Sequence, residues 1–212
     1  GAPATWPVFE GLGDLEATPD RNTLTLARPE EAERYFVIEE FQPPPLVLYS
    51  SGFEDGAVGW TTLINDEGAA TAWELGSPSG STGPLTGAGD SANAWTTNLG
   101  DYGPDSDVAL RTPAIDLSGL GGAVLRFDQY RDADGFADAA FVRFLRASDE
   151  VQLGAEIPIE MGTLDTDWNP SSVTVPAEAL GETILVEFRF VSDGSVDAFS
   201  GLSLDNFELS AE

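Results

Sequence analysis

The chain has 212 residues, of which 37 are acidic and 9 basic, giving a formal net charge of −28 at pH 7. Histidine, cysteine and lysine are absent, which excludes Ser-His-Asp triads, thiolate chemistry and lysine Schiff bases and leaves carboxylates for acid–base work or for binding hard cations such as calcium. A surface this negative repels phosphate backbones, and no run of 18 apolar residues occurs, so we expect neither nucleic-acid binding nor membrane insertion.

Residues 1–45 differ in composition from the rest and are predicted to be an N-terminal extension. Thr23–Leu26 alternates like a strand, Tyr35–Ile38 is typical of a short buried strand, and Pro43–Pro45 favours an extended linker. So short a segment cannot bury a core of its own without crosslinks. We therefore expect Tyr35–Ile38 to add a strand to the following domain or to pack on its edge. The alternative is that residues 1–45 are the tail of a preceding domain.

Residues 46–212 are predicted to form a single all-β domain. Apolar and polar residues alternate in Thr183–Val191 and again around Leu125 and Phe127, as in half-buried strands. The sequence predicts no long helix, and Pro176–Leu180 is one turn at most. The predicted strands are Leu46–Tyr49, Ala69–Glu74, Val108–Arg111, Ala123–Tyr130, Ala140–Arg146, Ser172–Val175, Thr183–Val191 and Leu202–Leu209. Many short strands with Gly/Pro turns between them indicate a sandwich or a barrel.

Several loops stand out by composition. Gly76–Asn93 is rich in Gly, Ser, Thr and Pro, and a loop of this length inside a compact domain is usually functional or anchored. Asp132–Asp138 resembles a calcium loop but lacks the third acidic residue and the bidentate glutamate of an EF-hand, so a hairpin loop is expected. Asp101–Asp107 is expected to be a solvated turn, with a second ion site as the alternative. The same alternatives apply to Asp165–Trp168.

An ordered set of motifs runs through most of the chain. In order, the motifs are Phe53-Glu54, Gly59-Trp60, Trp73 to Pro78, Trp95 to Leu99, Leu110 to Leu117, and Asp205 in the last strand. This order resembles the MAM-like jelly-roll modules that are appended to secreted bacterial proteases, including the immune-inhibitor-A type of metallopeptidase. The resemblance covers residues 51–209 and leaves residues 1–45 outside it.

The resemblance implies an all-β, two-sheet antiparallel jelly-roll sandwich of the concanavalin/MAM-like type, with an accessory role and one structural calcium ion (Ca2+). Glu54 and Asp205 are the ligand candidates that it gives, and Asp90 on the glycine-rich loop is a looser third. In a jelly roll the first and last strands can lie side by side, which would bring Glu54 and Asp205 together, and two carboxylates held close repel unless a cation lies between them. The alternative is that Glu54 caps a turn and Asp205 is solvated.

The five tryptophans divide into two groups. Trp60, Trp73 and Trp95 occupy motif positions and are predicted to pack in the core. Trp6 and Trp168 lie in predicted loops and are freer to contact a ligand. No ligand-binding residue can be assigned from the sequence.

We therefore predict a protein that is not an enzyme but a binding or adhesion module, secreted or at the cell surface, and a monomer. Its expected partner is an extracellular polysaccharide or a surface protein. One alternative is a purely structural spacer within a larger secreted protein. Another is a glycoside hydrolase or lyase that works with a pair of carboxylates.

Overall fold

The computed structural model describes residues 25, 45–135, 137–195 and 198–212. The chain divides into two units, Gly1–Gln42 and Pro43–Glu212, and all described strands belong to the second. The predicted strand Tyr35–Ile38 and Trp6 lie outside the described residues, as does Thr23–Leu26 apart from Thr25. No helix in the described part of the chain is long and apolar enough to cross a membrane.

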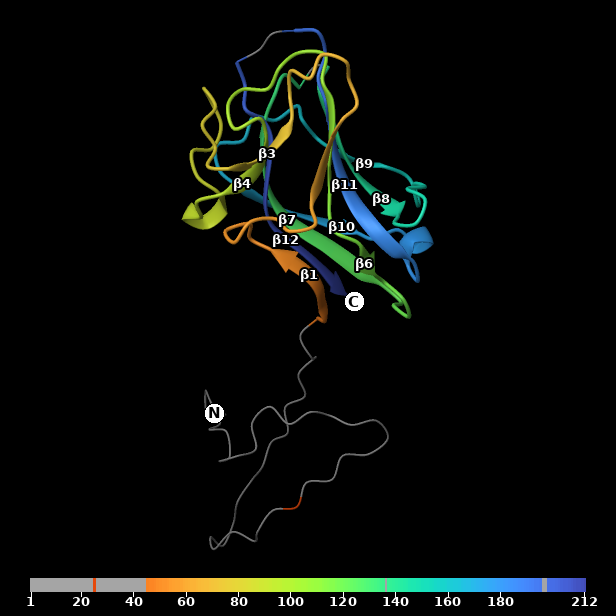
Figure 1. The fold of residues 1–212 in the computed structure, drawn as a ribbon. Helices are drawn as coiled ribbons and strands as arrows, with labels where there is room; N and C mark the ends of the chain where they lie inside the picture. The colour runs from red at the N-terminus through yellow and green to blue at the C-terminus, as the bar shows by residue number, and fades with distance from the viewer. Residues whose placement is uncertain (1–24, 26–44, 136, 196–197) are drawn as a thin grey trace, which may run out of the picture. The chain divides into compact units, whose positions relative to one another are not determined.

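The described residues form two antiparallel sheets of six strands each (Figure 1). In sheet A the order is β10 (Asn169–Thr174), β7 (Ala123–Asp132), β12 (Gly201–Ala211), β4 (Ala94–Thr97) and β3 (Trp73–Gly76), and β1 (Val47–Ser51) also pairs with β12. In sheet B it is β2 (Thr61–Ile64), β5 (Asp107–Arg111), β11 (Thr183–Val191), β8 (Ala139–Arg146) and β9 (Ile157–Ile159), and β6 (Ile115–Asp116) also pairs with β11. Two 3₁₀ turns, η1 (Ala88–Asp90) and η2 (Ala177–Ala179), complete the described elements. The predicted two-sheet sandwich is confirmed.

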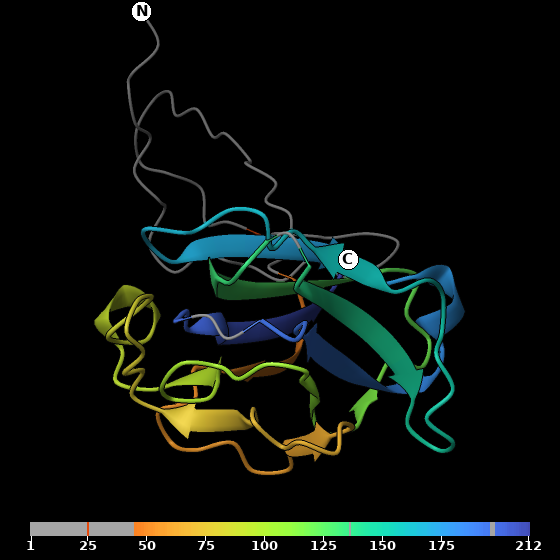
Figure 2. The ribbon, with the colours of Figure 1, turned by 90° about the horizontal axis from the view of Figure 1, so that it is seen from above.

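The core lies between the two sheets (Figure 2) and follows from the alternation in the sequence. Ile184, Val186, Phe188 and Phe190 of β11 are each at most 1% exposed, because alternate side chains of a strand face the same side. They pack toward side chains of sheet A: the ring of Phe188 lies 5.0 Å from that of Phe127 in β7, edge to face. Trp60, Trp73 and Trp95 are also buried in this core, as predicted.

The first and last described strands pair with each other, which confirms the expected adjacency. Val47 of β1 lies opposite Ser210 of β12, and Ser51 lies opposite Phe207. β4 pairs with Ser203 and Leu204 on the same edge of β12 that β1 pairs with further along, and β7 pairs with the opposite edge. The part of β12 that pairs with β4 and the part that pairs with β1 are separated by a bulge. There the register of β12 with β7 shifts after Asp205, and Asn206 has a φ of 47°. This bulge places Asp205 at the junction of β1 and β4.

Two sequence expectations were wrong. Asp132–Asp138 is not a hairpin loop, because β7 belongs to sheet A and β8 to sheet B, so the segment crosses between the sheets. The strand expected over Ala69–Glu74 begins at Trp73, since Ala69 has a positive φ of 49°, which a strand does not contain. Strands β2, β4, β6 and β9 were not predicted.

Candidate functional site

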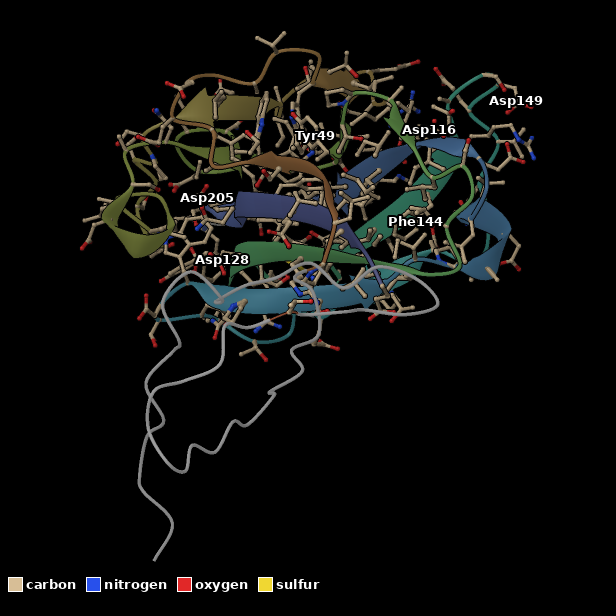
Figure 3. All side chains as sticks on the ribbon, turned by 90° about the horizontal axis from the view of Figure 1, so that it is seen from below. Tyr49, Asp116, Asp128, Phe144, Asp149 and Asp205 are labelled. Atoms are coloured by element: carbon tan, nitrogen blue, oxygen red, sulfur yellow. The ribbon has the colours of Figure 1, made fainter. Side chains whose placement is uncertain are left out.

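Asp205 is a fully buried carboxylate beneath the Gly76–Asn93 loop. Its neighbour Leu204 faces the core, so the alternation of β12 turns Asp205 to the outer face of sheet A, where Figure 3 labels it beside Asp128 of β7. One carboxylate oxygen, Oδ2, accepts hydrogen bonds from the Ala88 backbone N–H and the Ser91 hydroxyl, both at 2.8 Å. The other, Oδ1, accepts from the Asn206 N–H at 2.7 Å. Asp205 therefore anchors the loop, and the alternative that Asp205 is solvated was wrong.

Glu54 holds the end of the same loop from the other side. It lies three positions after Ser51, the last residue of β1, and its carboxylate accepts the backbone N–H groups of Asn93 at 2.8 Å and Ala92 at 3.2 Å. The structure thus brings the two predicted acids, 151 positions apart in the numbering, to one short loop segment. Asp90 lies on that segment in η1 and is exposed. Among the described residues no three acidic side chains approach closely enough to form a metal cluster, so Asp90 does not join Glu54 and Asp205 in one.

Oxygen atoms pack closely around Gly87 beside the Asp205 carboxylate. A methyl carbon placed on Gly87 would lie 2.1 Å from Ser91 Oγ, 2.5 Å from the Asn93 carbonyl oxygen and 2.6 Å from Asp205 Oδ2. These short distances mean that position 87 accepts only glycine. The carboxylate and carbonyl oxygens gathered there are of the kinds that calcium binds, so the chemistry of the donors suits this ion.

Burial raises the pKa of Asp205, because the charged carboxylate loses its hydration, although the hydrogen bonds from Ser91, Asn206 and Ala88 act in the opposite direction. The nearby charge of Asp128 raises it further. An ionised Asp205 is therefore costly in this position, and a cation beside it would offset that cost.

A second polar feature lies on the outer face of sheet B, which we call the central charge cluster: Arg111, Arg143, Arg189, Asp107 and Glu187. Glu187 of β11 lies directly opposite Arg111 of β5 and Arg143 of β8. Its carboxylate contacts Arg111 Nε at 2.7 Å and Arg143 Nη1 at 3.4 Å, and its side chain is 5% exposed. Arg189 binds Asp107 through two nitrogens, at 2.7 and 2.5 Å, which lowers the pKa of that carboxyl.

The cluster forms the floor of an open pocket of about 370 Å³, whose other lining residues are Asn65, Leu145, Glu150 and Gln152. The sequence had indicated that Glu187 and Arg189 face away from the core, and this holds. It did not indicate that Glu187 is buried, since that depends on which strands lie beside β11. The signal for this site is the pair of opposite charges within an otherwise largely apolar strand.

The remaining sequence candidates are anchored by contacts with other described residues. Trp168 is half-buried: its ring packs edge to face on Tyr130, and its Nε1 donates to the Thr86 carbonyl at 3.2 Å. Asp165 forms a bidentate ion pair with Arg131, with contacts of 2.8 and 2.9 Å, and is not a solvated loop residue. Asp101 accepts from the backbone and hydroxyl of Ser81. These acids thus tie loops together.

Asp138, at the end of the crossover between the sheets, is expected to make the stability of the protein depend on pH. It is buried, and loss of hydration raises its pKa even though the Tyr102 hydroxyl and the Asp193 N–H donate to it. The folded protein therefore holds this proton more tightly than the unfolded chain does, so the contribution of Asp138 to stability is greatest at low pH and is lost as pH rises through its folded pKa. In Asp138→Asn this dependence is removed. We expect urea unfolding from pH 4 to 7.5 to show the variant gaining stability relative to wild type as pH rises.

The control is Asp116→Asn. Hydrogen bonds from Ser118 lower the pKa of exposed Asp116, so its contribution is present at neutral pH and is lost on acidification. The control is expected to show the opposite and smaller trend. A difference between wild type and Asp138→Asn that does not change with pH would contradict the assignment.

No protein-family model matches the chain, and no curated protein matches it. Among solved structures, it is similar to the K1 cleaved adhesin domain of Lys-gingipain from Porphyromonas gingivalis W83, with 24% identity, a TM-score of 0.53, and coverage of 77% of this chain and 98% of that one. The K3 cleaved adhesin domain of the same protein gives 21% identity, the same TM-score of 0.53 and the same coverage.

A third similar structure is the enzymatically active domain of tailspike protein 4 of bacteriophage CBA120, with 14% identity, a TM-score of 0.52, and coverage of 76% of this chain but 20% of that one. These likenesses establish the fold. The chain contains an antiparallel jelly-roll β-sandwich with the architecture of bacterial adhesin domains, and the similarity to those domains extends over nearly their whole length.

Proposed function

We propose that the jelly roll is a non-catalytic binding module that acts outside the cell, in a secreted or surface-attached protein. The observation that carries this proposal is the fold shared with two adhesin domains over 98% of their length. The motif resemblance of residues 51–209 to MAM-like accessory modules supports the same conclusion. The partner that we propose is an extracellular polysaccharide or a surface protein, and the module acts as a monomer.

The roles of the acidic residues support a non-catalytic module. Glycosidases use two carboxyl groups that face each other across a sugar, about 5–10 Å apart, with one free to give a proton. In this protein the buried acids Glu187 and Asp205 are already engaged. Glu187 pairs with Arg111 and Arg143, and Asp205 accepts the Ala88 N–H and the Ser91 hydroxyl. A carboxylate engaged in this way stabilises the fold.

We also propose one structural calcium ion, held by Glu54, Asp205 and oxygens of the Gly76–Asn93 loop, without Asp90. The oxygen donors close to Asp205, Ser91 Oγ and the Asn93 carbonyl, support it, as does the net charge of −28, which a divalent cation partly offsets. The ion would supply a positive charge that fixes the loop over sheet A. Glu54 and Asp205 orient the loop through its N–H groups.

Binding without turnover is the expected result when the purified protein is tested on a glycan array, on insoluble polysaccharides and on bacterial cell walls. The bound polymer is then assayed for newly formed reducing ends. We expect retention on at least one polymer or cell-wall fraction and no release of sugars. Release of sugars that is lost when one Asp or Glu is replaced, with folding intact, would overturn the non-catalytic assignment. Retention on none of these materials would favour the spacer alternative.

A further inference from the structure

The outer face of sheet B concentrates the arginines of the described chain. Arg111, Arg143 and Arg189 lie on three adjacent strands, and each is held by a carboxylate: Arg189 by Asp107, Arg143 by Glu156 and Glu187, and Arg111 by Glu150 and Glu187. Their side chains are still 15–26% exposed, so they can meet a ligand from the open side. The face therefore offers fixed guanidinium groups and carboxylates side by side.

The register of the strands sets this arrangement. Arg111, Glu187 and Arg143 form one row across β5, β11 and β8. Arg189, two residues further along β11, reaches diagonally to Asp107 of β5, which lies opposite Val191. Because each long side chain is already held in an ion pair, binding a ligand costs little side-chain entropy, as in other preorganised sites. Asn65 and Gln152 add amide groups at the rim.

We propose that this pocket binds a segment of a neutral polysaccharide, which rests on the proposed function and assigns its site and ligand class. Sugar hydroxyls both donate and accept hydrogen bonds, and so match guanidinium N–H groups next to carboxylate oxygens. The pocket volume of about 370 Å³ falls within the usual range for small-ligand sites, about 300–1,000 Å³.

The charges of the pocket favour a neutral polar ligand over an anionic, cationic or apolar one. Among the residues that line the pocket, three guanidinium groups face three carboxylates, Asp107, Glu150 and Glu187, so the charges of the lining cancel. Glu156, which pairs with Arg143 from outside the lining, adds one negative charge nearby. An anionic polymer would have to displace one of these carboxylates and approach a chain of net charge −28. A cation would meet three arginines. An apolar ligand would bury ionised groups, because Leu145 is the one apolar residue among the nine described residues that line the pocket.

The test is affinity electrophoresis of the full chain, which measures how far a polysaccharide in the gel retards the protein. The neutral polymers are soluble mixed-linkage β-glucan, xyloglucan and galactomannan, and the anionic ones are alginate and polygalacturonate. We expect retardation by at least one neutral polymer and by neither anionic one. Arg189→Ala is expected to weaken binding about tenfold to a hundredfold, since a hydrogen bond to a charged group is lost. Gln152→Ala, which leaves every ion pair intact, is expected to weaken it less, and circular dichroism verifies folding of both variants.

Arg126→Ala is the matched control, because Arg126 is an exposed, ion-paired arginine in sheet A. It should bind as wild type does. Equal binding by wild type, Arg189→Ala and Gln152→Ala would overturn the assigned site while leaving a binding function in place. Binding of anionic polymers alone, or of no neutral polymer, would overturn the ligand class. The proposed function itself fails if the protein is also retained by no cell-wall fraction.

Discussion

Calcium is expected to raise the melting temperature of the wild-type protein by about 5–11 °C relative to the same protein in chelator. An ion that binds the folded state alone, at a hundredfold excess over its dissociation constant, stabilises by about 2.7 kcal/mol, and for a chain of this size each kcal/mol moves the midpoint by about 2–4 °C. The ligands responsible are Glu54 and Asp205, whose carboxylates both reach the Gly76–Asn93 loop. Differential scanning fluorimetry with calcium and with chelator measures the shift.

Two variants separate the ion from the hydrogen bonds that the same carboxylates make. Asp205→Asn can keep one acceptor oxygen for Ala88 and Ser91, whereas Glu54→Gln keeps one acceptor in place of the two that hold Ala92 and Asn93. Both variants lose the charge, so the calcium-dependent shift is expected to disappear in each. Asp116→Asn, an exposed carboxylate in β6, is expected to keep the full shift. If chelation leaves the wild-type midpoint unmoved, the calcium proposal is wrong, and the two acids anchor the loop through hydrogen bonds alone.

Phe188→Ala is expected to lower the free energy of unfolding by about 3–5 kcal/mol, a large share of the stability of an ordinary domain. Phe188 is 1% exposed and joins the sheets: its ring lies 5.0 Å from Phe127 of β7 and 6.3 Å from Phe207 of β12. Truncation removes buried apolar area and leaves a cavity between the sheets. Urea denaturation followed by tryptophan fluorescence measures the loss.

The control for this experiment is Val58→Ala, because Val58 is 91% exposed. Its expected effect is within about 0.5 kcal/mol of zero. A loss below about 1 kcal/mol for Phe188→Ala would mean that the two sheets do not pack through this ring.

Strands with strong alternation could be predicted from the sequence, and those without it could not. The bounds predicted for Thr183–Val191 match β11, where four buried residues alternate with outward ones. All four residues of β4 (Ala94–Thr97) are buried, since β4 lies inside sheet A and its outer face is not exposed to solvent, so its sequence shows no alternation. β6 and β9, of two and three residues, are too short to show a period.

The candidate sites divide in the same way. Glu54 and Asp205 could be placed together because a jelly roll pairs its first and last strands, and both contact the loop that composition had singled out. The central charge cluster could not be predicted. Arg111, Arg143 and Glu187 come from strands separated by long stretches of sequence, and their contact depends on β11 lying between β5 and β8 in one register.

The pairing of β1 with β12 also determines how the sandwich responds to mechanical force. The two strands run antiparallel, so residues 46 and 212 emerge at the same end of the pair, where the Ala211 N–H donates to the Leu46 carbonyl. Tension between these two points acts along the interstrand hydrogen bonds, which therefore break one after another from that end. β12 stays held to β7 along its other edge. Under tension the first strand is expected to peel away at low force while the remaining strands of the sandwich stay folded.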